Sequence, residues 1–224
     1  MLSAVLALGL RRDFKLPPME QVTLLIFMRG KSSKGMPAEQ LETMQKGHIA
    51  NLERLGKAHK APCAGPFENG GDRRGLVVLT LPKDKVPQEF ENDPFVKEGL
   101  LKLELHTWMV PKGLFAWPTL TKFEMGMFTF AWVSKGKNPK LPEPKDELAK
   151  HVEHNLGLMR DGRAALIGPF LDENPWALGG YIFNETDEAK INEWQKADPR
   201  IQSGRLEFHT LKLYMAKGLF KRLP

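Results

Sequence analysis

The sequence has almost no cysteine, and this absence narrows the classes of protein to which the chain can belong. Cys63 is the only cysteine among 224 residues, which excludes a disulfide-stapled secreted fold and a metal site built from several thiolates. We expect Cys63 to be a small buried residue on a strand, and the protein to be cytoplasmic. Runs of about 18 apolar residues are also lacking, so we expect no membrane-spanning helix and no membrane partner.

Clustered positive charge with interleaved aromatic residues is missing as well. Lys and Arg outnumber Asp and Glu by 33 to 27, a net charge of +6, but the excess is spread along the chain. The stretch RRGLVVLTL at 73–81 lacks the aromatic residues of an RNA-recognition sheet. We therefore expect a small-molecule ligand or substrate, and no nucleic acid, as the partner.

Residues 1–18 stand apart from the rest of the chain. They contain the apolar stretch MLSAVLALGL, which is short for an export signal and has its arginines after it. Two interpretations stay open. The segment is either the remnant of an export signal, which would make the protein exported, or an unstructured lead-in to a first strand near Met19.

The two halves of the chain repeat the same short motifs in the same order. These are a histidine 17 residues before Gly-Pro-Phe (His48 and His151), an Asp-Pro pair (Asp93 and Asp198), and Lys-Gly-Leu-Phe (112–115 and 217–220). A shared order of motifs predicts an internal duplication. The expected units are repeat 1 at 19–116, a linker at 117–122 and repeat 2 at 123–224.

Apolar periodicity predicts the same element order in both repeats. In repeat 1 the expected strands are 21–28, 61–67, 75–81 and 101–110, and the expected helices are 38–58 and 83–99. In repeat 2 they are 125–133, 163–170, 180–185 and 205–215, with helices at 143–161 and 187–203. The order β-α-β-β-α-β is typical of a ferredoxin-like unit, an antiparallel sheet with both helices on one face.

The strands carry apolar residues on both faces. In 21–28, Val22 and Leu24 alternate with Leu25 and Phe27, and helices can cover only one of these faces. We therefore predict an α+β fold of two ferredoxin-like repeats, packed sheet to sheet as an intramolecular pseudo-two-fold α+β barrel. Such a pseudo-dimer would be a monomer, with further self-association left open.

Four features together resemble the YCII-related family: the first-helix histidine, Gly65-Pro66 opening the second strand, Asp93-Pro94-Phe95 in the second helix, and LELHTW at 103–108. Repeat 2 matches separately. The resemblance implies the dimeric α+β barrel, a His-Asp dyad in each unit, and action on small, often aromatic or halogenated, molecules. Repeat 2 departs from the pattern at Leu213, which replaces Trp108, and at Pro175-Trp176, so its pocket is expected to differ or to be silent.

The residues themselves give His48 a defined setting. It falls within a stripe of apolar residues at helical spacing, formed by Leu41, Met44, Leu52 and Leu55. A carboxylate within reach of a buried imidazole would fix its tautomer and make it a general base or acid near neutral pH. The predicted catalytic residues are His48, Asp93, His151 and Asp198.

Each of these residues also has a structural explanation. Asp followed by Pro is the usual sequence of a helix N-cap, and a histidine on an apolar face is usually a hydrogen-bonded core residue. Duplication copies structure and function together, so recurrence does not decide between the explanations. The sequence also leaves open whether Asp93 meets His48 at all.

Other polar features are weaker. His151 and His154 are one helical turn apart, but no third ligand is evident, so we predict neither a metal nor a cofactor. Lys102, Glu104, His106 and Trp108 share one face of the last strand of repeat 1, as do Glu207 and His209 in repeat 2, and this face either lines a cavity or is an exposed edge.

Two functions follow. The first is an enzyme for elimination or isomerisation of a small apolar or phenolic molecule. The second is a non-catalytic module that binds a small ligand or a partner.

Overall fold

Both halves of the chain run through the same series of strands and helices. The structure is a computed structural model that describes residues 15–117, 124–173 and 176–224. The elements of the first half are β1 (Met19–Arg29), α2 (Ala38–Lys57), β2 (Cys63–Glu68), β3 (Arg73–Leu79), the 3-10 turn η1 (Lys83–Lys85), α3 (Val86–Phe90), α4 (Pro94–Lys97) and β4 (Leu101–Pro111). Those of the second half are β5 (Met125–Lys135), α5 (Glu147–Arg160), β6 (Ala164–Pro169), β7 (Gly179–Phe183), α6 (Glu188–Gln195), α7 (Pro199–Gln202) and β8 (Leu206–Ala216).

The second helix expected in each repeat is broken into short pieces. The break falls at Asp93-Pro94 in the first half and at Asp198-Pro199 in the second. Proline has no backbone N–H and is favoured at the first position of a helix, where none is needed. Each Asp-Pro therefore starts a new helical turn, α4 or α7, whose direction is set by the aspartate.

The eight strands form one sheet in the order β4-β1-β3-β2-β8-β5-β7-β6, and all neighbours are antiparallel. The two halves join where β2 pairs with β8, with Phe67 opposite Leu213. The outermost strands, β4 and β6, are brought together by the bridge Trp108↔Phe170. The sheet is thus a nearly closed barrel, in which the halves are joined edge to edge and unpaired strand edges are reduced.

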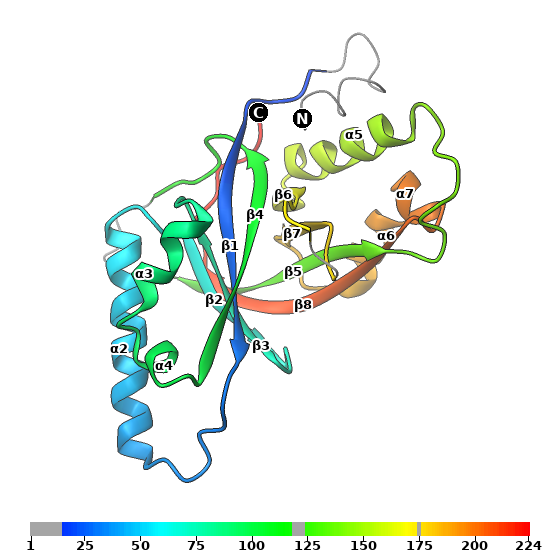
Figure 1. Cartoon of the computed structure of the whole chain (residues 1–224). Coiled ribbons are helices and arrows are strands. Elements are labelled where there is room, and N and C mark those ends of the chain that lie inside the picture. Colours follow the sequence, from blue (N-terminus) through cyan, green and yellow to red (C-terminus); the bar gives the residue numbers. More distant parts are fainter. Residues whose placement is uncertain (1–14, 118–123, 174–175) are drawn as a thin grey trace.

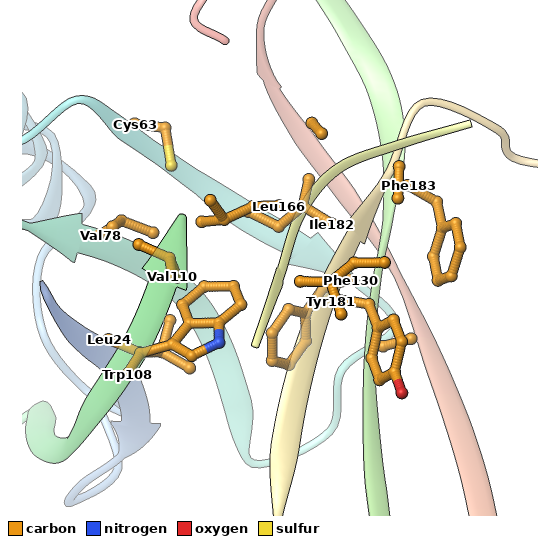
Figure 2. Close-up of a cluster of buried hydrophobic side chains, with 14 of the residues drawn as sticks. Leu24, Cys63, Val78, Trp108, Val110, Phe130, Leu166, Tyr181, Ile182 and Phe183 are labelled. Carbon is orange, nitrogen blue, oxygen red and sulfur yellow. The ribbon is translucent and has the colours of Figure 1, made fainter. Parts of the chain in front are cut away.

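The helices of the two halves lie on opposite sides of this barrel (Figure 1), with α2, α3 and α4 on one side and α5, α6 and α7 on the other. The strands between them are buried on both faces, as expected from their apolar pattern: Leu24 and Leu25 are both 0% exposed. Leu24, Trp108 and Val110 pack with Phe130 and Leu166 of the second half in one cluster (Figure 2). A second cluster lies under the helices of the first half, and includes Leu25, Leu55 and Phe90.

The repeated Gly-Pro motif lies at the seams between the halves. A side chain on Gly65 would collide with the backbone carbonyl of Tyr214 in β8, and one on Gly168 would collide with that of Met109 in β4. Only glycine allows so close an approach of two backbones. The recurrence of this motif is therefore explained by barrel closure, at equivalent places in the two halves.

The repeated Lys-Gly-Leu-Phe segments pair with each other. Ala116 donates a backbone hydrogen bond to Leu219 at 2.9 Å, and Lys221 donates one to Leu114 at 2.6 Å. Between these two bonds, Phe115 forms a bridge with Phe220. Each segment therefore donates to the other the same kind of hydrogen bond that it accepts from it. This reciprocity is typical of the interface between two identical subunits related by a two-fold axis.

Parts of the expected organisation lie outside the described residues. These are residues 1–14 of the lead-in 1–18, nearly all of the linker 117–122, and Pro175. Among the helices of the described ranges, none is both long and apolar enough to cross a membrane. Cys63 is a buried residue of β2, as predicted, and burial raises the pKa of its thiol to about 12.

Candidate functional site

His48 lies near the middle of α2, on the face that is turned towards the sheet. Met44, His48 and Leu55 are the buried residues of this helix, while Leu41 and Leu52 are half-buried. The predicted apolar stripe is therefore present. It carries the imidazole into the space between helix and sheet, where His48 is 8% exposed.

The carboxylate of Asp93 meets this imidazole within the same half of the chain. His48 Nδ1 lies 2.7 Å from Asp93 Oδ2, and Asp93 is 1% exposed. The other oxygen, Oδ1, accepts the backbone N–H groups of Phe95 at 3.1 Å and Val96 at 3.4 Å, which caps α4. Helix capping and a His-Asp pair are alternatives at the level of sequence. The structure contains both, one on each carboxylate oxygen.

The surroundings keep Asp93 ionised. Burial opposes the charge, but the hydrogen bond and the charge of His48, the N–H of Val96 and the amide of Asn51 outweigh it, so the pKa of Asp93 lies below its usual value. An ionised carboxylate can only accept hydrogen bonds, so Nδ1 of His48 donates. In the neutral imidazole, Nε2 then carries the lone pair.

A cavity of about 690 Å³, here called the α2 cavity, opens beside His48 between α2 and the sheet. Its inner wall is largely apolar and includes Phe27, Leu52 and Phe95. The ring of Phe27 contacts His48 edge-on at 5.1 Å between centroids, and that of Phe95 lies at 5.5 Å. This volume falls among those of small-molecule sites, about 300 to 1,000 Å³. Nε2 of His48 has no hydrogen-bond partner among the described residues, which leaves it for a ligand.

The second half contains the same pair in a different setting. His151 Nδ1 lies 2.6 Å from Asp198 Oδ2, and Asp198 Oδ1 accepts the N–H of Arg200 at 2.9 Å. Nε2 of His151, however, is 3.2 Å from the side-chain amide of Asn155. Asn155 stands four residues after its histidine, where the first half has Leu52. The second imidazole therefore has polar partners at both nitrogens.

The space beside this second dyad is filled by larger side chains. Ala64 pairs with Val77 in the first half, and the corresponding pair in the second is Ile167 with Tyr181. Tyr181 is 2% exposed. Burial raises the pKa of its hydroxyl, as does the charge of Asp198, and a hydrogen bond to Asn155 opposes them only partly. Ala64, which lines the α2 cavity, is thus replaced by the larger Ile167, and its neighbour Val77 by the larger Tyr181.

A buried ion pair between Arg205 and Glu147 also lies in the second half, at a position where the first half has a cavity-lining residue. Arg205 Nε donates to Glu147 Oε2 at 2.8 Å, and the two other guanidinium nitrogens donate to the carbonyls of Leu141 and Pro142 at 2.5 and 2.7 Å. Arg205 corresponds to Leu100, because each lies seven residues after the aspartate of its half. Leu100 lines the α2 cavity. The expectation that the pocket of repeat 2 differs is supported by these replacements.

His154 does not join the second dyad in a metal site. Burial lowers the pKa of its imidazole, which the charge of Asp198 opposes, and its Nε2 is buried without a hydrogen-bond partner in the described part of the chain. Within that part, no three His, Cys, Asp or Glu side chains are grouped so as to hold a metal ion.

The polar face of β4 is turned towards the barrel interior. His106 is 6% exposed and lies 2.8 Å from Glu104, which also accepts the indole N–H of Trp176 at 2.6 Å. The guanidinium of Arg73 lies over the Trp176 ring at 4.5 Å. Of the two explanations for this face, the exposed edge is wrong for His106 and Trp108. It holds only for Lys102 at the strand end.

Apolar periodicity does not identify the residues that distinguish the surroundings of the two imidazoles. Leu52 and Ala64 line the α2 cavity in the first half, and the second half has Asn155 and Ile167 at these positions, with Tyr181 opposite Ile167. A comparison of the two repeats at these positions carried the signal. For Leu52 and Asn155 it can be read directly, because each lies four residues after its histidine; for Tyr181 the strand register is needed, because the two halves differ in length between β2 and α4.

Comparison with known protein families identifies the second half of the chain. A model described as the YCII-related domain matches residues 127–212. The half that carries this match is the one in which Nε2 of the dyad histidine lies beside Asn155. Comparison with curated proteins found no match.

Solved structures share the fold over most of the chain. One is a heme-binding protein from Thermus thermophilus, 17% identical, with a TM-score of 0.58 over 90% of this chain and 95% of that one. Another is a variant of chlorite dismutase from Candidatus Nitrospira defluvii, 11% identical, with a TM-score of 0.57 over 90% and 92% of the two chains. At these identities the likeness shows the fold alone.

Proposed function

Because the chain carries a YCII-related domain within an α+β barrel, we propose that it is an acid–base enzyme for a small apolar or phenolic molecule bound in the α2 cavity. One observation supports this more than any other. His48 lines the cavity with Nδ1 held by the buried carboxylate of Asp93, while Nε2 has no partner among the described residues. His48 is the proposed base and Asp93 its positioning residue.

The proposed reaction starts when Nε2 of His48 removes a proton from a C–H bond beside an electron-withdrawing group. The electron pair of that bond forms a C=C bond. In an elimination, the leaving group on the neighbouring carbon departs with its own bonding pair. In an isomerisation, the imidazolium returns the proton to a different carbon. Asp93 stabilises the imidazolium in either case, and the apolar wall limits water around it.

In this proposal the second dyad has a structural role. Asp198 caps α7 and orients His151, whose Nε2 is taken by Asn155. The two halves are treated as copies of one ferredoxin-like unit, at 19–116 and 123–224, related by a pseudo-two-fold axis through the paired Lys-Gly-Leu-Phe segments. The matching strand orders β4-β1-β3-β2 and β8-β5-β7-β6 support this. A barrel completed within one chain favours a monomer.

Heme binding is a second candidate function, favoured by the setting of the same imidazole. A heme iron needs an accessible imidazole nitrogen, and ligand histidines usually have their other nitrogen held by a carboxylate or carbonyl. His48 meets both conditions, so its donor atom fits this cofactor. Bound heme would supply redox chemistry at the iron. Titration with hemin, followed at the Soret band, tests this: His48→Gln should abolish a 1:1 complex that His151→Gln retains.

Proton abstraction can be measured without knowledge of the natural substrate. A panel of small phenols and cyclic 1,3-dicarbonyl compounds is first screened by thermal shift. For compounds that bind, deuterium incorporation from D₂O into the C–H bond next to the carbonyl or hydroxyl-bearing carbon is followed by NMR. We expect the wild-type protein to accelerate the exchange, His48→Gln to lose the acceleration, and the matched control His151→Gln to keep it.

The outcomes separate the two main functions. Binding that depends on His48, without exchange in the wild-type protein, would establish the non-catalytic ligand-binding module instead. Exchange that survives His48→Gln would remove His48 as the base. If His48→Gln unfolds the protein, His48→Asn, which retains a donor to Asp93 in a smaller side chain, replaces it.

A further inference from the structure

The wall of the α2 cavity is divided between an apolar interior and a basic rim. The interior is formed by rings and aliphatic groups around His48, such as Phe27, Leu52 and Phe95. The rim carries Arg29, Lys31 and Arg74, all exposed. We call these three residues the basic rim. A ligand that fills the cavity would place its apolar part on His48 and its outer end among three cations.

The described residues that line the cavity include no carboxylate to balance this charge. Asp93, the nearest acid to the imidazole, is 1% exposed and has both oxygens occupied by His48 and the α4 backbone. Asp72 and Glu98 lie outside the lining and partly balance Arg29 and Lys31, so Arg74 is the uncompensated cation at the mouth of the cavity. A site lined by one sign of charge attracts ligands of the other sign.

The side chains of the basic rim make only weak contacts, which a ligand could replace. Arg29 meets Asp72 at 3.3 Å and Lys31 meets Glu98 at 3.9 Å, with all four side chains at least half exposed. Such surface pairs contribute little. In the described ranges Arg74 has no carboxylate partner, and its one hydrogen bond is a 3.4 Å contact to the carbonyl of Gly71. Its guanidinium is thus available for a planar, bidentate anion such as a carboxylate.

The second half offers a comparison. The position of Arg74 falls in the β6–β7 hairpin, at Leu178 or Gly179, and neither of these residues is a cation. Lys135, at the end of β5, corresponds to Arg29 at the end of β1, but there the space beside the imidazole is filled. In the described residues, the combination of a cavity beside the imidazole and an arginine at its mouth is therefore found in the first half.

From this division of the wall we infer that the ligand of the α2 cavity is an organic anion, with a compact apolar or aromatic body and one carboxylate. The inference rests on the proposed function of the same cavity and names its substrate class. The carboxylate binds Arg74, assisted by Arg29. The apolar body extends inward to Nε2 of His48 and brings the carbon chain, not the charged end, to the base.

Pairs of acids and neutral amides of the same shape test the inference. Benzoate, phenylacetate and 3-phenylpropanoate are compared with benzamide, phenylacetamide and 3-phenylpropanamide by calorimetry in low salt. We expect at least one acid to bind about tenfold more tightly than its amide, since charge-assisted hydrogen bonds are about twice as strong as neutral ones. Arg74→Gln should lower the affinity for that acid by about tenfold, and leave the affinity for the amide unchanged.

The control Lys135→Gln removes the same charge from the filled half, and should change the affinity by less than about twofold. If amides bind as tightly as acids, and His48→Gln weakens both, the anionic substrate class is wrong and the proposed function stands. If acids bind but resist Arg74→Gln, the basic rim is not the anion site. If neither series binds at millimolar concentration, both the substrate class and an aromatic substrate for the α2 cavity are contradicted.

Discussion

Asp93 uses its two carboxylate oxygens for two different partners, and the pair can be separated by substitution. Asp93→Asn keeps an oxygen for Phe95 and Val96, because asparagine is an equally good N-cap. Its amide nitrogen would donate to Nδ1 of His48, which moves the ring proton to Nε2 and removes the base. We expect the catalysed deuterium exchange to fall by about 10²- to 10⁴-fold, with ligand affinity changed much less.

The imidazole tautomer provides a readout that a purely structural role would not move. Two-dimensional ¹H–¹⁵N NMR should show the proton of His48 on Nδ1 in the wild-type protein and on Nε2 in Asp93→Asn. The matched variant Asp198→Asn changes the equivalent cap in the second half and should leave both the exchange rate and the His48 signals as they are. An Asp93→Asn protein with full activity would contradict the proposed role.

The lowered pKa of Asp93 also predicts how the stability of the fold changes in acid. Its pKa is lower in the folded protein than the usual value of about 3.9, so the folded state favours the ionised form. The resulting stabilisation is complete above about pH 4 to 5 and is lost as the pH falls through the lowered pKa. Urea unfolding between about pH 6 and pH 2.5 should therefore show a shallower loss of stability in Asp93→Asn than in the wild-type protein. Parallel curves would contradict the prediction.

At the scale of residues, the members of the site were predictable and their arrangement was not. Helical spacing placed His48 on the buried face of α2, and Asp-Pro identified Asp93 as a cap. Their contact depends on the break between α3 and α4, which turns the aspartate towards α2. The openness of the cavity depends on side-chain volumes at lining positions such as Leu52 and Ala64, which periodicity does not address.

At the scale of elements, α2 and α4 are in close contact at Gly47. A Cβ there would lie 2.7 Å from Cγ of Pro94, so alanine would push α4, and with it Asp93, away from His48. Gly157 in α5 is the control, because a Cβ there has open space. We expect Gly157→Ala to stabilise the protein by about 0.5 to 1 kcal/mol through helix propensity. Gly47→Ala should destabilise it by about 1 to 3 kcal/mol, measured by urea unfolding.

Equal stabilisation by both alanines would show that the two helices are not held at this contact. A destabilised Gly47→Ala that retains the His48 signals and the exchange rate would show instead that packing and positioning are independent.

The element order was predicted well because strands and helices differ in their apolar period. All eight strands lie within a few residues of the expected ranges, and so does α2. The helix expected at 83–99 consists of η1, α3 and α4, since the apolar pattern continues across Asp93-Pro94 although the backbone turns there. Periodicity records which residues are buried, and not whether the chain between them is one helix.

For the whole molecule, Trp108 is the side chain that closes the barrel. It is 0% exposed, and its indole Nε1 donates to the carbonyl of Gly168 at 2.9 Å across the β4–β6 seam. Trp108→Phe removes this bond and part of a fully buried side chain at the seam, for an expected loss of about 1 to 3 kcal/mol. Trp194→Phe, at a half-buried position away from the seam, should cost less than about 1 kcal/mol.

Unfolding of the Trp108→Phe protein should be followed by far-UV circular dichroism and by fluorescence. A single coincident transition is expected, because the halves share one sheet. Two separated transitions would show that each half is stable without the other.

The sequence predicted that both faces of the strands are buried and that the two sheets pack on each other, but not that the halves join edge to edge in one sheet. Apolar alternation in Leu24 and Leu25 shows that a second layer must exist. It does not show that β2 pairs with β8, or that β4 and β6 meet at Trp108, because edge pairing is made by backbone groups that every residue has. The repeated glycines Gly65 and Gly168 marked these seams.

The reciprocal pairing of residues 114–116 with 219–221 occurs within one polypeptide. In a barrel assembled from two identical chains, any amino-acid exchange would be inherited by both halves at once, and a bulky residue that blocks one pocket would block its twin. Here each position is encoded separately. Leucine at 52 can coexist with asparagine at 155. One half of the molecule can therefore be tightly packed while the other keeps a cavity for a ligand.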